Sequence, residues 1–464
     1  MTLSRRDFLT TAAAVTAGFA GFRTFIAGTA YGEPDSALIA EGLGPLISDP
    51  NRTMDLPQGF NYQIISTAGD EMTDGFLVPH KPDGMATFPG LDGRTILIRN
   101  HELSPDKPEW GAFGATNELL AKLDPAMLYD SGHGKLPCLG GTTTVVYNTR
   151  ERKVECQFLS LAGTGRNCAG GPTPWNSWVS CEETVQRADD AFEKDHGYNF
   201  EVLASASIQL VKPVALKEMG RFNHEAVAID PRSGIVYQTE DRDDGLLYRY
   251  IPNEPGELVR GGKLQALCIR DQAALDTRNW GLFETAIKPG QAFATSWINL
   301  DDIESPNDDL RHRGCAAGAA RFARGEGMWY GHDAIYFACT NGGAAKAGQI
   351  WRYTPSPSEG SNGESSDPGK LELFIEPNNG ALVENADNLT IAPWGDIVVC
   401  EDGNDEQFVV GVTPQGKFYQ IARNAKSDSE LAGATFSPDG TTLFVNIQHE
   451  GLTIAITGPW RGTA

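Results

Sequence analysis

An apolar segment with the residue types of a β-strand recurs six times along the chain, and each copy ends in a short polar cluster. The copies occupy residues 96–102, 178–183, 235–241, 335–341, 397–402 and 443–450. Their ends lie about 50 to 100 residues apart, which is the range of a propeller blade with loop insertions. Turn signals such as the Pro-Asp-Gly sequence at 438–440 separate short strand-like runs, as expected for hairpins within blades. The pattern predicts an all-β fold, a six-bladed β-propeller with loop insertions.

Five of the six polar clusters contain carboxylates. In a propeller the equivalent strands of all blades end on the same side of the axis, so these carboxylates are expected to gather there. Carboxylates on a short radius repel one another unless cations lie between them. Adjacent strand residues point to opposite faces, so only one member of a pair such as Glu240 and Asp241 should reach the same centre. This parity argument predicts a metal site but does not decide which member of each pair binds.

The charge balance restricts the partners of the chain. It carries 61 acidic and 38 basic side chains, a formal net charge of −23. Such a surface repels nucleic acid and anionic membranes, so neither is expected as a partner. Stable membrane insertion is not expected either, because the apolar stretch at residues 9–22 is too short to span a bilayer.

Residues 1–30 have the features of an export signal, followed by the propeller at 31–464. Arg5 and Arg6 precede Phe8 and the apolar stretch, and small residues at 27–30 suit a cleavage site. The segment resembles a twin-arginine signal, which implies export of the folded protein by the twin-arginine translocase. An ordinary secretory signal with a basic start is the alternative. We predict a periplasmic or secreted bacterial protein.

Cys168 lies in a glycine-rich loop at residues 163–171, where a thiol has little packing purpose. A metal-ligand or reactive role is therefore expected, with a disulfide as the alternative, since the chain has eight cysteines and an exported protein meets an oxidising compartment. The sequence contains no CxxC motif and no Cys/His spacing typical of a zinc site.

Two further segments carry candidate metal and anion ligands. Glu225 follows Asn223, and oxygen donors of this kind suit a hard cation. Arg324 lies two residues before Glu326, so in an extended segment both side chains point the same way. Glu326 would then bind a cation while the planar guanidinium of Arg324 holds a phosphoryl oxygen. A simple ion pair between the two residues is the alternative.

Several short segments occur in an order that resembles the PhoX family of bacterial alkaline phosphatases. They lie at residues 99–102, 140–143, 167–171, 174–175, 181–183, 223–225, 239–241, 324–327 and 349–353. The resemblance covers most of the chain after residue 30. It implies a six-bladed propeller phosphatase domain, twin-arginine export, and a cofactor of two Fe³⁺ ions with Ca²⁺ ions bridged by oxo groups. The implied activity is metal-dependent hydrolysis of phosphate monoesters, with small-molecule phosphate esters as substrates.

The resemblance also assigns site residues. The family's thiolate ligand of iron matches Cys168, and its carboxylate ligands of the metal cofactor match Glu183, Glu225, Asp241 and Glu326. Arg324 matches the phosphate-contacting arginine, so it is expected to be catalytic and substrate-binding. The family's lysine upstream of the thiolate is missing here, and Arg166 is expected to replace it in substrate binding. Glu240 and Glu401 are further metal candidates from their strand-end position alone, as is Glu450.

Two other functions fit the same repeat. A calcium-dependent lactonase-like propeller hydrolase would use carboxylates around one axial ion and would need no cysteine. A non-catalytic, calcium-stabilised binding propeller would need neither the cysteine nor Arg324. The roles of Cys168 and Arg324 therefore separate the phosphatase from both alternatives.

Overall fold

The computed structural model describes residues 34–282 and 286–461, so the predicted signal at 1–30 lies outside the described residues. Within the described part the chain is almost entirely β-strand and connecting loop, with one α-helix, α2 (Leu310–Ala316). Short 3-10 helices occupy several connections: η1 (Ser36–Leu38), η2 (Leu91–Gly93), η3 (Pro108–Trp110), η4 (Glu118–Lys122), η5 (Pro125–Met127), η6 (Gly132–Gly134), η7 (Lys217–Met219) and η8 (Leu258–Arg260). No described helix is long and apolar enough to cross a membrane.

The named strands pair in five antiparallel sheets. One holds β4 (Pro82–Pro89), β5 (Arg94–His101), β6 (Gly140–Asn148) and β7 (Lys153–Thr164). The next holds β8 (Asn167–Pro172), β9 (Ser177–Glu182) and β10 (Asn199–Leu203). A nine-stranded sheet joins β11 (His224–Ile229), β12 (Val236–Glu240), β13 (Leu247–Pro252), β14 (Gly262–Ile269), β15 (Ala292–Asn299), β19 (Lys370–Ile375), β18 (Gln349–Thr354), β17 (Ala334–Cys339) and β16 (Gly325–Gly331).

The last two sheets combine strands from both ends of the chain. One runs β1 (Leu46–Ile47), β2 (Met54–Pro57), β23 (Phe418–Asn424), β22 (Phe408–Val412), β21 (Ile397–Glu401) and β20 (Ala386–Ile391). The other runs β24 (Leu431–Phe436), β25 (Thr442–Ile447), β26 (Leu452–Thr457) and β3 (Asn61–Thr67). Because β3 pairs with β26, the beginning and the end of the described chain close the ring together.

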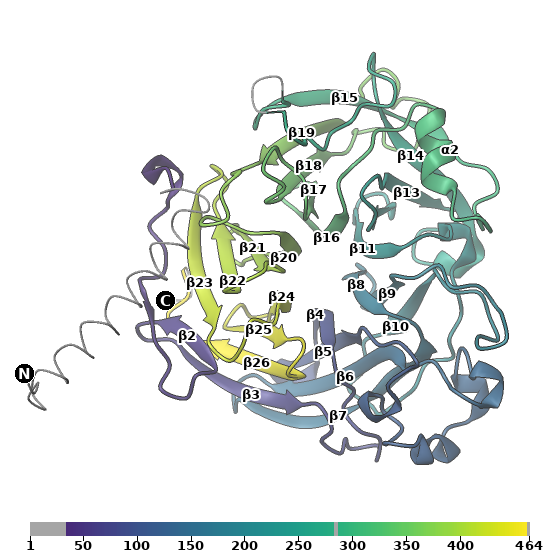
Figure 1. The fold of residues 1–464 in the computed structure, drawn as a ribbon, viewed down its shortest axis with the longest axis vertical. Helices are drawn as coiled ribbons and strands as arrows, with labels where there is room; N and C mark the ends of the chain where they lie inside the picture. The colour runs from purple at the N-terminus through teal and green to yellow at the C-terminus, as the bar shows by residue number, and fades with distance from the viewer. Residues whose placement is uncertain (1–33, 283–285, 462–464) are drawn as a thin grey trace, which may run out of the picture.

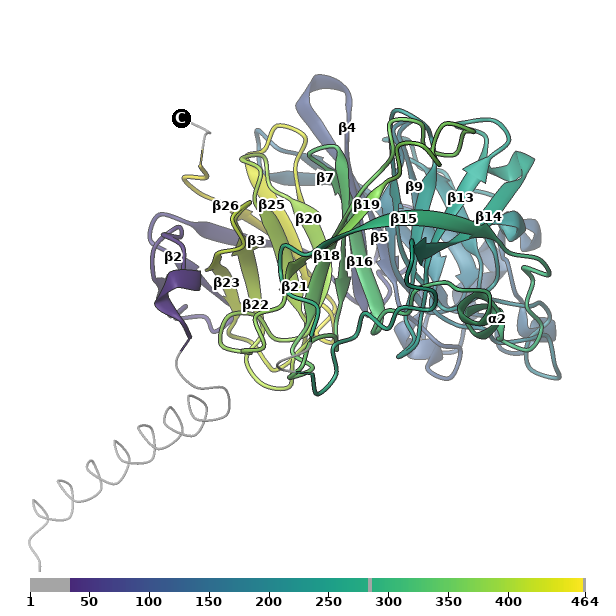
Figure 2. The same cartoon turned by 90° about the horizontal axis from the view of Figure 1, so that it is seen from above.

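The sheets stand around a central axis (Figure 1). Six strands lie innermost, and they contact one another in the cyclic order β4, β8, β11, β16, β20, β24 and back to β4. We call these six the ring strands. Figure 2 shows the same ring from the side, with the sheets standing roughly parallel to the axis. The expected all-β, propeller-like architecture is confirmed.

The core lies between neighbouring sheets, so both faces of a sheet are apolar. In β21, Val398 and Cys400 pack into one cluster while Ile397 and Val399 pack into the other. This explains why the repeated segments are continuous apolar runs rather than alternating ones. The Pro-x-Gly turns connect paired strands as predicted: residues 393–395 lie between β20 and β21, and residues 438–440 between β24 and β25. Gly395 and Gly440 adopt positive φ values of 96° and 73°, which glycine tolerates best.

Each ring strand is interrupted near its start by a β-bulge. In β11, His224 pairs with Glu240 and Val227 with Gln238, so two residues of β11 oppose one residue of β12. The same shift occurs in the five other ring strands, against the second strand of each hairpin. A bulge re-aims a side chain and often lies beside a functional site. Here the bulge occurs at the equivalent position in all six ring strands.

Candidate metal centre

The first bulge residue of most ring strands carries a side chain that could bind a metal ion. In ring order these residues are Asp83, Cys168, Glu225, Glu326, Asp387 and Gly433. Five of the six carry a carboxylate or a thiol, and all five are buried. The following residue is small in most copies, as at Gly84 and Gly327. A Cβ added to Gly327 would lie 2.6 Å from the Cα of Asn388, so small residues permit the ring strands to approach one another.

The residue directly after the second strand of each hairpin supplies the next set. These residues are Glu102, Glu183, Asp241, Thr340, Asp402 and Gln448. This placement decides the parity left open by the sequence: the second member of each acidic pair lines the cavity. Glu182, Glu240 and Glu401 are the last strand residues, and they point the other way, as the pleat requires.

The two sets converge on a cavity of about 210 Å³ at one end of the ring. It is lined by Asp83, Glu102, Arg166, Cys168, Glu183, Glu225, Asp241, Arg324, Glu326, Asp387, Asp402, Glu430 and Gln448. Nine of these thirteen side chains are carboxylates, against two arginines. So much negative charge in one small cavity favours bound cations.

Three groups of ligand atoms within the cavity are close enough to share an ion. They are Asp83 with Glu102 and Cys168, then Cys168 with Glu183 and Glu225, then Glu225 with Glu326 and Asp387. In each group the ligand atoms lie within 4.8 Å of one another. Because Cys168 and Glu225 each belong to two groups, the groups form a continuous chain. The cavity therefore offers several adjoining positions where a cation could bind.

Both arginines of the cavity are held by its carboxylates. Arg324 donates from Nε and Nη2 to the two oxygens of Asp241, at 2.7 and 3.0 Å, and from Nη2 to Glu326 at 2.6 Å. Arg166 Nη2 lies 2.6 Å from Glu183 and 2.9 Å from Glu102. The ion pair between Arg324 and Glu326, considered above as the alternative to a ligand role, is present, and both residues line the cavity.

Burial and mutual repulsion act on the same carboxyl groups. Burial, followed by the charge of Asp241, raises the pKa of Glu183 to about 7. Burial and the charge of Asp402 raise the pKa of Asp387 to about 7 as well. The pKa values of Glu225 and Glu326 also lie well above their usual range, with burial as the main cause. Without cations, the ionisation of these carboxyls is therefore unfavourable near neutral pH.

The thiol of Cys168 points into this network. Its Sγ lies 2.9 Å from Oε2 of Glu183, and burial raises the pKa of the thiol well above its usual value. All eight cysteines, which fall within the described ranges, are free thiols, so the structure excludes the disulfide considered for Cys168. A metal ion beside the sulfur would favour the thiolate despite the surrounding carboxylates.

The structure thus brings together Cys168, Glu183, Glu225, Asp241, Glu326, Arg324 and Arg166, all expected from the sequence. It does not bring Glu240 and Glu401 to the cavity. Glu240 accepts hydrogen bonds from the Tyr248 hydroxyl and the Leu246 amide, and Glu401 accepts them from the amides of Glu384 and Phe408. Both carboxylates instead hold neighbouring loops. Glu450 does not line the cavity either.

Sequence reasoning missed Asp83, Asp387 and Glu430, and it selected Glu401 rather than Asp402. A signal for the bulge residues was present, because Asp83-Gly84-Met85 has the same pattern as Glu326-Gly327-Met328. Asp387 had no such signal, since a large Asn388 follows it. Glu430 precedes β24 and enters the cavity from outside the strand pattern.

Comparison with solved structures supports the fold. Pseudomonas fluorescens PhoX in complex with vanadate, a transition state analogue, matches with a TM-score of 0.63 at 18% identity, covering 90% of this chain and 98% of that one. A gluconolactonase from Xanthomonas campestris covers similar shares (90% and 99%) but reaches a TM-score of only 0.40 at 10% identity. None of the curated proteins compared with the chain matches it.

Comparison with family profiles is more decisive. The profile of the family described as Alkaline phosphatase PhoX matches residues 41–451, which is most of the chain and contains every residue of the cavity. The family membership expected from the short segments is therefore confirmed. The chain belongs to the PhoX family of alkaline phosphatases and is a phosphatase.

Proposed function

We propose that the cavity at the end of the ring binds Fe³⁺ and Ca²⁺ and hydrolyses phosphate monoesters of small molecules. The observation that carries the proposal is the continuous chain of ligand groups through Cys168 and Glu225, with Arg324 at its edge. The donor set fits such a cluster, because it combines one thiol with many carboxylates, and because ionisation of the carboxyls is unfavourable when no cation is present. A zinc-only site would use more Cys or His donors.

The donors divide by chemistry. Cys168, Glu183, Glu225, Asp241 and Glu326 are the proposed iron ligands, because they match ligand positions of the family, and Glu183 and Glu225 group directly with the thiol. Asp387, Asp402 and Glu430 offer oxygen alone, which suits Ca²⁺. When bound, the cations would supply Lewis-acid activation of the phosphoryl group.

The protein itself would orient the substrate. Asp241 and Glu326 fix the guanidinium of Arg324, and its Nη1 makes no hydrogen bond to another described residue. Nη1 therefore remains for a phosphoryl oxygen, and its charge would stabilise the transition state. Arg166, with 43% of its side chain exposed, would provide a second contact to the phosphate.

Replacing Cys168 tests this proposal most simply. Cys168→Ser is expected to lose iron and to lower the hydrolysis of an aryl phosphate monoester by more than about 100-fold. Cys156→Ser, a half-buried thiol on β7 outside the cavity, is the matched control and should keep both. Full phosphatase activity in Cys168→Ser would contradict the iron site. Lactone hydrolysis that survives in this variant with calcium alone would favour the lactonase alternative.

We also propose that the protein is exported by the twin-arginine translocase and acts in the periplasm or outside the cell. The support is the pair Arg5 and Arg6 ahead of an apolar stretch. Replacing both by Lys should leave the protein in the cytoplasm on cell fractionation, and unchanged export would contradict the proposal. Nucleic acid is not proposed as a substrate, given the charge of −23.

Residues 31–464 are proposed to form one six-bladed propeller phosphatase domain. The nine-stranded sheet would contribute two blades, β11–β14 and β16–β19, connected through β15. The cyclic contacts of the six ring strands support this count. A crystal structure without six-fold pseudosymmetry of the ring would contradict it.

A further inference from the structure

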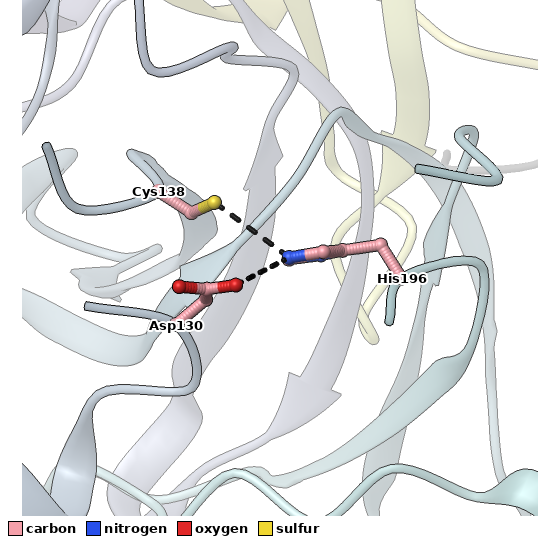
Figure 3. Close-up of side chains that lie close together, drawn as sticks. All are labelled: Asp130, Cys138 and His196. Carbon is pink, nitrogen blue, oxygen red and sulfur yellow. Dashed lines mark hydrogen bonds and ion pairs between the residues drawn. The ribbon is translucent and has the colours of Figure 1, made fainter. Parts of the chain in front are cut away.

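A second group of ligand-type side chains lies buried away from the cavity. Asp130 and Cys138 come from the connection between β5 and β6, His196 comes from the one between β9 and β10, and the three side chains point toward one another (Figure 3). Asp130 follows η5, Cys138 precedes β6, and His196 precedes β10. At most 1% of each residue is exposed. No spacing in the sequence indicates this group, because the fold brings His196 to the other two residues from 58 positions beyond Cys138.

The distances from Nε2 of His196 are compatible with three of the four ligand positions of a tetrahedral zinc site. Nε2 of His196 lies 3.2 Å from Oδ2 of Asp130 and 3.7 Å from Sγ of Cys138. Zinc bonds of about 2.0 Å to oxygen and nitrogen and about 2.3 Å to sulfur, at tetrahedral angles, place nitrogen about 3.3 Å from oxygen and about 3.5 Å from sulfur. All three ligand atoms fall within 4.8 Å of one another.

The histidine is oriented for metal binding by a carboxylate behind it. Nδ1 of His196 lies 2.7 Å from Oε1 of Glu182, the last residue of β9. A carboxylate that accepts a hydrogen bond from Nδ1–H fixes the tautomer of the histidine and leaves the Nε2 lone pair for a metal. Glu182 also accepts hydrogen bonds from the amides of Gly165, Gly197 and Tyr198, which stabilise its negative charge.

Charge and hydrogen-bonding capacity fit a divalent cation. A Cys138 thiolate and the Asp130 carboxylate would neutralise a Zn²⁺ ion, and the thiol proton would leave to solvent. Asp130 already accepts backbone hydrogen bonds from the amides of Gly132, Glu193 and Lys194, so its orientation is fixed. Without a metal, a protonated His196 would donate to both carboxylates, with the Cys138 thiol 3.7 Å from the same Nε2 atom.

From this geometry we infer a structural zinc site formed by Asp130, Cys138 and His196, with Glu182 as the carboxylate that orients the histidine. The donor set of one thiolate, one imidazole and one carboxylate suits zinc better than calcium. The ion would tie the long connection between β5 and β6 to the one between β9 and β10. Glu182 directly precedes Glu183, so the site would also fix the end of the strand that carries a cavity carboxylate. The inference does not depend on the proposed function, because the two sites share no ligand.

Zinc K-edge absorption of protein purified from zinc-supplemented cells tests the inference. The expected result is one zinc ion per chain with one sulfur neighbour at about 2.3 Å and nitrogen or oxygen neighbours at about 2.0 Å. Cys168→Ser protein should give the same spectrum, since its missing sulfur belongs to the cavity. Protein without zinc, or zinc without a sulfur neighbour in Cys168→Ser, would overturn the inference.

Variants of the site provide a second test. Cys138→Ser should lose the zinc ion and melt at a lower temperature, while Cys156→Ser should keep both. Zinc content unchanged in folded Cys138→Ser would overturn the inference. If Cys138→Ser does not fold, the spectra of the wild-type and Cys168→Ser proteins still decide the question.

Discussion

At the scale of single residues, three positively charged side chains occupy the same position relative to a ring strand and share an unusual backbone conformation. Lys81, Arg166 and Arg324 each directly precede a ring strand and adopt left-handed φ values of 46°, 47° and 50°. This conformation costs a non-glycine residue about 1 kcal/mol or more, so it persists where the surrounding structure fixes it. Each of the three side chains forms an ion pair with a cavity carboxylate. The turn therefore places a positive charge beside the carboxylates at three points of the ring.

Arg324→Ala is expected to weaken catalysis while leaving metal content nearly intact. A lost contact to a phosphoryl group in a partly desolvated site costs about 2–4 kcal/mol of transition-state stabilisation, or about 30- to 1000-fold in rate. Arg324→Lys should recover only part of this loss, because an ammonium lacks the planar fork. Phosphate-ester turnover and bound iron and calcium are measured together. Arg321→Ala, which removes a partly exposed arginine paired with Asp276, is the control. Wild-type turnover in Arg324→Ala would contradict the proposed contact between Arg324 and the phosphoryl group.

Substitutions of Glu401 and Asp402 test whether the first residue stabilises neighbouring loops while the second binds metal in the cavity. Asp402→Asn should lower calcium content and, as a consequence, activity, because Asp402 lines the cavity. Glu401→Gln should leave metal content unchanged but destabilise the fold by about 1–3 kcal/mol, since an amide cannot accept from both backbone amides in place of the carboxylate. Metal analysis and thermal unfolding of both variants distinguish the roles. A loss of metal in Glu401→Gln with Asp402→Asn unaffected would reverse our assignment.

At the scale of elements, the sequence predicted the strands well and the ligands incompletely. The repeated apolar runs correspond to the second strands β5, β9, β12, β17, β21 and β25, because strands buried on both faces are recognisable as continuous hydrophobic segments. The ring strands carry more polar and small residues, so Asp83 and Asp387 escaped notice. Bulges were also not predictable from strand periodicity, because a bulge inserts a residue and changes which side chain faces the axis.

Gly327→Ala tests the close approach of two ring strands. The added methyl group would lie 2.6 Å from the Cα of Asn388, and backbone atoms cannot move aside cheaply. We expect a loss of stability of about 1–3 kcal/mol together with weaker metal binding, because Glu326 and Asp387 flank the contact. Gly363→Ala is the control, since its nearest neighbour is the movable hydroxyl of Ser358. Equal melting temperatures for the two variants would contradict this description of the ring.

At the scale of the whole molecule, ring closure and cation binding act on the same ring strands. The pairing of β3 with β26 closes the ring, which brings all ring strands into contact around one axis. The same closure concentrates nine carboxylates in one cavity, whose repulsion opposes the folded state unless cations are bound. Ions that bind only the folded protein would therefore stabilise it by mass action.

The stability of the chelated protein should depend on pH in a defined direction. When no metal is bound, the pKa values of Glu183 and Asp387 are raised to about 7 from ordinary values of 4.5 and 3.8. A raised folded-state pKa contributes stability that is present below the unfolded value and is lost as the pH rises through about 7. Chelated protein should therefore melt at a lower temperature at pH 8 than at pH 5. Protein reloaded with metal ions should not show this decrease in melting temperature between pH 5 and pH 8. Calorimetry of both forms checks it, and a chelated protein equally stable at both pH values would contradict the expected cation dependence.

The central claim is that the bulge residues of the ring strands hold the metal ions of a phosphatase. Anomalous X-ray diffraction at the iron edge, on crystals of active protein, tests it most directly. We predict iron peaks inside the cavity, at bonding distance from Cys168 and from the carboxylates of Glu183 and Glu225. Active crystals with no iron peak in the cavity, or with iron bound only elsewhere, would contradict the claim.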